Sequence, residues 1–233
     1  MPAFDNLTGR RFLLFAAVLG LVAGCAGSSP TIDTSDEAEM TFDGLYPVKG
    51  STADEAWARP GVDFSAYSKI MLQGVGIEYR PGGESGRLYS TRRGGDYFEV
   101  SEQQKERFEE LLRDEFREEL GRSEHFTIVD EPGPDVLLIR GRLLDVVSYI
   151  PPEPVGMVDI YLSKVGEATL VLEIRDSTSE AIFARAIDRR AAEDMMGFSE
   201  SNRVTNTREI RRLISFWATK LRERLDTYGA PAE

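Results

Sequence analysis

SEQQKERFEELLRDEFREELG (residues 101–121) carries the clearest periodic pattern in this chain of 233 residues. Its apolar side chains recur at helical spacing and share one face, at positions 108, 111, 112, 116 and 120. Ser101 is followed three residues later by Gln104, as in a capping box, and Gly121 closes the pattern. The pattern predicts one amphipathic helix with a defined beginning and end.

Segments rich in β-branched and aromatic residues surround this helix and predict strands, at residues 69–79, 126–129, 136–149, 170–174 and 181–187. The last two flank the turn sequence DSTSE (residues 176–180), as the strands of a hairpin do. A second amphipathic helix is predicted from about Thr207 to Leu225. Residues 42–64 are expected to be an extended lead-in with aromatic anchors, among them Trp57.

The element order is therefore β-α-β-β-β-β-α. A wholly parallel, doubly wound sheet is disfavoured because a single helix lies between the strands. The order predicts an α+β fold, with a single mixed or antiparallel sheet of about five strands and two amphipathic helices packed on one face. We expect Trp217, at the centre of the last helix's apolar stripe, and Trp57 to belong to the core.

The amino terminus resembles a secretory signal. Arg10 and Arg11 precede an apolar run, Phe12–Ala23, that is too short to span a bilayer, for which a helix needs about 20 residues. Leu21–Cys25 (LVAGC) then resembles the lipobox of bacterial lipoproteins, and Cys25 is the single cysteine of the chain. We therefore predict a signal peptide over residues 1–24 and lipidation of Cys25.

The lipoprotein resemblance also implies a location. It implies three acyl chains on Cys25, enough for stable membrane attachment. The residue after the cysteine is Ala26 rather than the aspartate associated with retention in the inner membrane. This points to the outer membrane, facing the periplasm. Residues 25–40 are small, polar and acidic and predict a flexible linker after the lipidated cysteine, and residues 41–233 are predicted to form a single domain.

The charge balance limits the classes of partner. The formal net charge is −12, with 29% charged and 41% hydrophobic residues. An acidic chain of this kind argues against nucleic acid, whose affinity depends on Lys and Arg contacts to phosphate. The lipid anchor at Cys25 is the predicted contact with the membrane.

Chemistry-bearing residues are sparse. One histidine, His125, one cysteine and scattered carboxylates form no pattern of metal ligands. His125 lies between a helix end and a strand, where a structural role is favoured over that of a catalytic base. Neither a phosphate-binding glycine fingerprint nor a nucleophile elbow occurs. We expect a protein without catalytic residues or a cofactor, and not an enzyme.

A loop between residues 80 and 96 gathers arginines in this otherwise acidic chain: Arg80, Arg87, Arg92 and Arg93. Tyrosines are interleaved with them, and such a pattern can hold a phosphate, a carboxylate or a sugar. The alternative is a solvated loop without a ligand, which is favoured because loops vary freely. These four arginines are the candidate anionic-ligand site.

Several stretches, taken in order, resemble the uncharacterised bacterial lipoprotein family DUF3313: Arg59–Asp63 (RPGVD), Tyr67–Leu72 (YSKIML), Pro132–Leu137 (PGPDVL), Val165–Ala168 (VGEA), Glu173–Ser177 (EIRDS), Asp188–Arg190 (DRR), Phe216–Ala218 (FWA) and Leu221. The resemblance runs from about Phe42 to Leu225. The family has no assigned activity, so the resemblance implies no catalytic residues.

Two functions remain open at this point. The first is a non-enzymatic, membrane-anchored envelope module that binds another envelope component, a protein or a glycan. The second is an auxiliary lipoprotein of an envelope transport system that holds a lipid or a small amphiphile. An apolar pocket of several hundred cubic ångströms would favour the second function. A filled core with an exposed apolar or unpaired-strand surface would favour the first.

Overall fold

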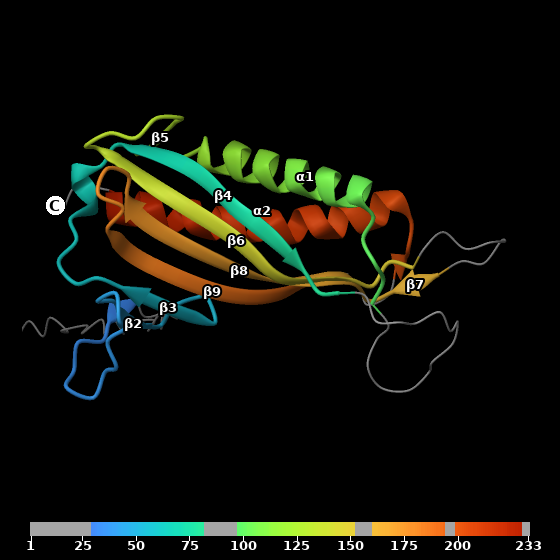
Figure 1. Cartoon of the computed structure of the whole chain (residues 1–233), viewed down its shortest axis with the longest axis horizontal. Helices are drawn as coiled ribbons and strands as arrows, with labels where there is room; N and C mark the ends of the chain where they lie inside the picture. Colours follow the sequence, from blue (N-terminus) through green and yellow to red (C-terminus); the bar gives the residue numbers. More distant parts are fainter. Residues whose placement is uncertain (1–28, 82–96, 152–159, 194–198, 230–233) are drawn as a thin grey trace, which may run out of the picture.

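Eight strands form one mixed sheet, and two helices cover one of its faces (Figure 1). The computed structural model describes residues 29–81, 97–151, 160–193 and 199–229. The order across the sheet is β1-β2-β3-β9-β8-β6-β4-β5. The bounds of these strands are β1 Thr31–Ile32, β2 Tyr46–Lys49, β3 Glu55–Ala58, β4 Lys69–Tyr79, β5 Thr127–Val129, β6 Val136–Ser148, β8 Lys164–Asp176 and β9 Ile182–Glu193.

The long strands lie where the sequence predicts strands, but β8 and β9 extend well beyond the predicted residues 170–174 and 181–187. Strand β4 occupies the predicted residues 69–79, and β8 and β9 form the predicted antiparallel hairpin around residues 177–181. Strand β4 runs parallel to β5 and β6, and the other pairings in this sheet are antiparallel. The sheet is therefore mixed, as one of the two predicted forms required.

The predicted number of about five strands is wrong. Three further strands, β1, β2 and β3, extend the sheet beyond β9, and a separate two-stranded sheet pairs β7 (Tyr161–Leu162) with β10 (Ser199–Glu200). Strands β2 and β3 have only four residues each, too few for an alternating pattern to stand out. They lie in the expected lead-in. Strand β1 pairs Thr31 and Ile32 with β2, within the segment for which a linker was expected.

Helix α1 (Glu102–Leu120) begins and ends as its sequence predicts. The Ser101 hydroxyl accepts a hydrogen bond from the Gln104 backbone N–H, and the Gln104 side chain accepts one from the Ser101 N–H, which completes the capping box. Gly121 is the C-cap. Helix α2 (Arg203–Gly229) begins earlier than expected because Asn202 caps it: the backbone N–H groups of Val204 and Thr205 both donate to its Oδ1 at 3.0 Å.

The packed core lies between the two helices and the inner part of the sheet. One buried cluster joins Leu120 of α1 and Leu225 of α2 to Ile70 of β4 and Leu137 of β6. A second cluster places Trp217 of α2, 4% exposed, against Leu143 of β6, which confirms the expectation for this tryptophan. Both helices therefore bury their apolar stripes on the same face, as predicted. Among the described residues, neither helix is long and apolar enough to cross a membrane.

Candidate functional site

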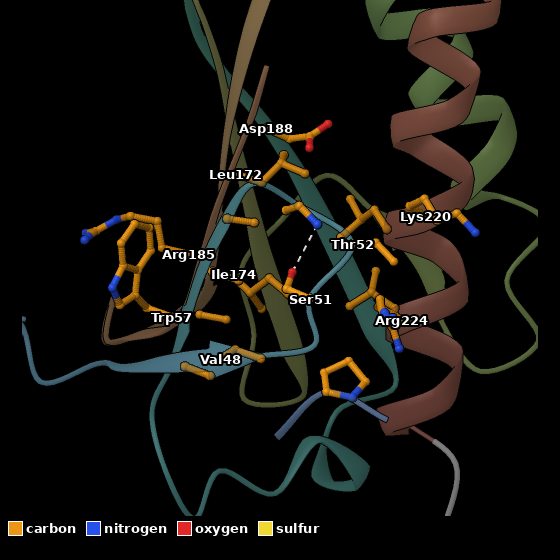
Figure 2. Close-up of a pocket in the computed structure, with 18 of the residues that line it drawn as sticks. Val48, Ser51, Thr52, Trp57, Leu172, Ile174, Arg185, Asp188, Lys220 and Arg224 are labelled. Atoms are coloured by element: carbon orange, nitrogen blue, oxygen red, sulfur yellow. Dashed lines mark hydrogen bonds between the residues drawn. The ribbon is translucent and has the colours of Figure 1, made fainter. Parts of the chain in front are cut away.

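A cavity of about 410 Å³ lies between the carboxyl-terminal half of α2 and the part of the sheet formed by β8, β9, β3 and β2 (Figure 2). Val48, Leu172 and Ile174 border it on the sheet side, and Leu221 and Leu225 belong to its helix side. Pro30 and Ile32, at the start of the described chain, also line it. Its volume is within the range of about 300–1,000 Å³ typical of small-molecule sites.

Alanines create this space. In the sheet register, Ala56 of β3 pairs with Ala186 of β9, and Ala58 pairs with Ala184. The next strand, β8, places Leu172 beside Ala186 and Ile174 beside Ala184. Four positions on the face that meets α2 thus carry only a methyl group, beside two full-sized aliphatic side chains. Because these alanines do not reach α2, the gap stays open.

A buried carboxylate is among the residues that line the cavity (Figure 2). Asp188 of β9 is 6% exposed and accepts hydrogen bonds from Trp217 Nε1 at 2.7 Å and from Arg190 Nε at 2.6 Å. The backbone N–H of Asp54 donates to the same carboxylate at 3.3 Å. These donors occupy both oxygens, so Asp188 acts as a structural acceptor that positions Trp217, β9 and the turn before β3.

Two cations lie on the helix side. Lys220 and Arg224 are one turn apart on α2 and both border the cavity (Figure 2). Lys220 Nζ lies 2.8 Å from Glu223 Oε2. No carboxylate of the described residues lies within 4.0 Å of the Arg224 guanidinium. An anionic group at this side of the cavity would therefore meet positive charge on α2.

The other two arginines that border the cavity hold the sheet together. Arg59 donates from Nε to the Ile182 carbonyl at 2.9 Å and from Nη2 to the Asp43 carbonyl at 2.7 Å. Arg185 pairs with Asp43 and with Glu173 on the opposite face of the sheet. Trp57 and Arg185 turn their side chains away from α2 (Figure 2). Trp57 is only half-buried and lies outside the core clusters, so the core expectation for this residue is wrong.

Of the predicted arginine loop, only Arg80 lies within the described residues; Arg87, Arg92 and Arg93 lie outside them. Arg80 Nε donates to Asp145 Oδ1 at 2.6 Å, and its guanidinium lies 5.5 Å from the centre of the Tyr97 ring. Hydrogen bonding from Arg80 lowers the pKa of the Asp145 carboxyl. Asp145 has a left-handed backbone (φ 54°) at a register shift in β6, which places its carboxylate beside Arg80. Arg80 is thus engaged by a carboxylate, and the anionic-ligand loop stays a prediction.

The other predicted positions give little further chemistry. Cys25 lies outside the described residues. His125 is exposed between the end of α1 and β5, as its position in the sequence indicated. Within the described residues, no group of three or more His, Cys, Asp or Glu side chains is placed to hold a metal ion.

The cavity was not predicted from the sequence, although two segments carry a signal of it. Glu55–Ala58 (EAWA) and Phe183–Ala186 (FARA) both alternate alanine with a large side chain. Each alanine pair points to α2, and the large residue between them, Trp57 or Arg185, points to the opposite face. The alternation becomes informative only when the pairing of β3 with β9 is known.

The comparisons with known proteins place the chain in a family. A family model described as "Protein of unknown function (DUF3313)" matches residues 34–221. The chain belongs to the DUF3313 family. This match confirms the resemblance found in the sequence. No curated protein matches the chain.

Several solved structures show a distant likeness. Protein XCC0632 from Xanthomonas campestris has a TM-score of 0.39 and 10% identity, over 74% of this chain and 90% of that one. PelC from Paraburkholderia phytofirmans, solved as a dodecamer, has a TM-score of 0.33 and 12% identity, over 72% and 95%. A homologue of a neuraminyllactose-binding hemagglutinin from Helicobacter pylori has a TM-score of 0.31 and 15% identity, over 69% and 82%. At these scores the likenesses do not establish a shared function.

Proposed function

We propose that this protein is an envelope lipoprotein whose domain holds a single-chain amphiphile with an anionic head group. The cavity of about 410 Å³ carries the proposal, because its apolar walls and alanine floor leave room for an acyl chain between α2 and the sheet. Of the two functions left open by the sequence, this cavity supports the second, an auxiliary that holds a lipid or small amphiphile. Binding of an envelope protein or a glycan stays a prediction.

The anionic head group is inferred from Lys220 and Arg224. An acyl chain in the cavity would be flanked by these two cations on α2, while Arg59 and Arg185 are already engaged in the sheet. Asp188 also lines the cavity, and its two oxygens already accept hydrogen bonds from Trp217, Arg190 and Asp54. The charge distribution around the cavity therefore favours a carboxylate or phosphate on the α2 side. No covalent step is proposed, and the domain acts by binding alone.

Filling the cavity tests its occupancy. We expect the chain from residue 26, without the signal peptide and Cys25, to bind dodecyl phosphate in a calorimetric titration. Ala186→Leu should weaken that binding at least about tenfold, because the new side chain occupies the cavity. Ala191→Leu is the matched control, since it makes the same change on the same strand at a position that pairs on the opposite face. Binding that is equal in the Ala186→Leu variant and in wild type would contradict the proposal.

The head group is tested separately. Replacing both Lys220 and Arg224 with Gln should reduce affinity for dodecyl phosphate by about tenfold or more, because hydrogen bonds to charged groups contribute about 1.5–3 kcal/mol. Affinity for the neutral dodecanoyl glycerol should stay the same. An equal loss for both probes would show that these cations do not select the head group.

The anchor has its own test. The predicted signal peptide and lipobox require that Cys25 carries the lipid. Metabolic labelling with a fatty-acid analogue should mark the wild-type chain, and the Cys25→Ser chain should remain unlabelled. Label on the Cys25→Ser chain would contradict this part of the proposal, without bearing on the cavity.

A further inference from the structure

A phenylalanine in the turn that precedes β2 is almost fully exposed to solvent. Phe42 is 98% exposed, and its neighbour Met40 is 55% exposed, whereas Leu45 at the end of the same turn is fully buried. A single exposed apolar side chain is ordinary, since Val204 is 77% exposed as well. Two that are neighbours in the chain, one of them on a turn that the backbone holds in place, form a small apolar surface that can enter another phase.

The turn that carries Phe42 is held rigidly. The Thr41 hydroxyl donates to Asp43 Oδ1 at 2.6 Å and accepts from the Leu45 N–H at 3.0 Å, and the Thr41 N–H donates to the Leu45 carbonyl at 2.8 Å. Gly44 has a φ of 82°, which a side chain would disfavour. Arg59 and Arg185 hold Asp43 from the sheet side. The turn therefore holds Phe42 in an outward position.

The position of the turn puts it within reach of a membrane that holds the amino terminus. Cys25 is six residues before Thr31, so an extended chain bridges them in at most about 22 Å. Thr31 pairs with Lys49 at one end of β2, and the turn precedes Tyr46 at the other end. A strand of this length spans on the order of 10 Å. Figure 1 shows this part of the chain (blue) at the opposite end of the molecule from the start of α2.

The size and charge of the surface around Met40 and Phe42 indicate which kind of partner it can bind. Two side chains make up a small part of the area of about 800 Å² that a standard protein interface covers on each partner. Insertion into the interfacial layer of a bilayer needs no complementary surface and suits a few apolar residues beside an anchor. Exposed Asp36, Glu37 and Glu39 lie just before the turn and would be repelled by anionic lipids.

We propose that Met40 and the turn Thr41–Leu45 form a membrane-contact site, which inserts Phe42 and Met40 into a bilayer whose head groups carry no net charge. The contact adds to the lipid anchor and fixes how the domain stands on the membrane. It also brings Pro30 and Ile32, which line the cavity, to the membrane side of the domain. The inference rests on the proposed lipid anchor at Cys25, and it does not depend on what the cavity holds.

Tryptophan quenching in vesicles tests the contact. Full-length chain with Phe42→Trp, reconstituted through its anchor into phosphatidylcholine vesicles, should lose most of the added emission when the acyl chains are brominated. Val204→Trp is the matched control, because Val204 is 77% exposed at the start of α2, at the other end of the molecule. The wild-type chain supplies the background from Trp57 and Trp217.

Three outcomes decide the proposal. Quenching at position 42 without quenching at position 204 supports it. Equal quenching at both positions, or none at position 42, overturns it. Adding phosphatidylglycerol should weaken the quenching at position 42, and salt of about 0.1 M or more should restore it by screening the acidic residues, because the Debye length is then about 10 Å or less. Stronger quenching with phosphatidylglycerol would overturn the assignment to an uncharged surface.

Discussion

The two halves of the sheet pack against the same layer of helices, but one half is densely packed and the other leaves a cavity. Under α1 and α2, strands β4 and β6 carry Ile70, Leu137 and Leu143, all of which are fully or almost fully buried. Beyond β8, strands β9 and β3 carry alanines toward α2 and leave a cavity. Helix α2 spans both halves with one apolar stripe. The difference therefore arises from side-chain size at a few paired positions, and the backbone arrangement is continuous across it.

The largest effect is expected at Trp217, which separates the filled half from the cavity. Trp217→Ala should lower the free energy of unfolding by about 3–5 kcal/mol, because it removes a buried aromatic ring and enlarges an existing void. It would also leave Asp188 without one of its donors. With a typical total stability of about 5–15 kcal/mol, this change can unfold the domain. Urea denaturation measures it.

A second variant at the same position separates packing from hydrogen bonding. Trp217→Phe keeps an aromatic ring and loses the indole N–H, so a smaller cost of about 1.5–3 kcal/mol is expected from the lost hydrogen bond to a charged group, while Asp188 keeps its bond from Arg190. If both variants melt within a couple of degrees of wild type, Trp217 contributes little to packing at the boundary between the filled half and the cavity.

An effect of intermediate size is expected when Ala is replaced with Leu, and the change in stability should have opposite signs in the two halves. Ala168 of β8 is 4% exposed and packs in the cluster of Leu143 and Trp217, so Ala168→Leu should destabilise by about 1–3 kcal/mol through overpacking. Ala186→Leu makes the same change over the cavity and should be neutral or stabilising, by up to about 2 kcal/mol, as in other cavity-filling substitutions. Thermal melts of both variants measure the difference. Destabilisation of similar size in both would show that the two halves are packed equally densely.

The comparison also shows which features the sequence could predict. The β4 strand, the capped α1 helix and the β8–β9 hairpin were predicted correctly because each is long or ends in a local signal, such as the Ser101–Gln104 box. The four-residue strands β2 and β3 were missed because they are shorter than a recognisable alternation. The cavity depends on Ala56 pairing with Ala186, residues far apart in the chain. Such a site depends on which residues of two strands pair with each other, and a local sequence pattern does not specify that pairing.

The smallest effect concerns the opposite face of the cavity half, where ion pairs tie β9 to the segment before β2. Burial acts to raise the pKa of the Asp43 and Glu173 carboxyls, but hydrogen bonds and charge outweigh it and leave both pKa values below their ordinary range. For Asp43 the partners are Thr41 and Arg185; for Glu173 they are Arg175 and Arg185. A carboxyl with a lowered folded-state pKa stabilises the fold fully above its unfolded value of about 4 and loses that contribution as the pH falls below it.

Acid should therefore loosen the cavity half before the filled half. Asp43 and Glu173 both pair with Arg185 of β9, so their protonation weakens the hold on the segment that leads into β2 and β3. Paired carboxyls with a lowered pKa occur beside the filled half as well, at Glu119 and Asp135, but there the apolar clusters around β4 and β6 hold the strands independently of pH. As the pH is lowered from 7 to 4 and below, we expect amide hydrogen exchange, relative to the intrinsic rate, to rise at Ala56 and Ala58 before it rises at Leu137 and Ile139.

Glu173→Gln should reduce the pH dependence of the free energy of unfolding. It should also lower that free energy at pH 7, within about 1 kcal/mol for an ion pair of this kind. Uniform loosening of both halves on acidification would show that these ion pairs do not brace the cavity separately from the core.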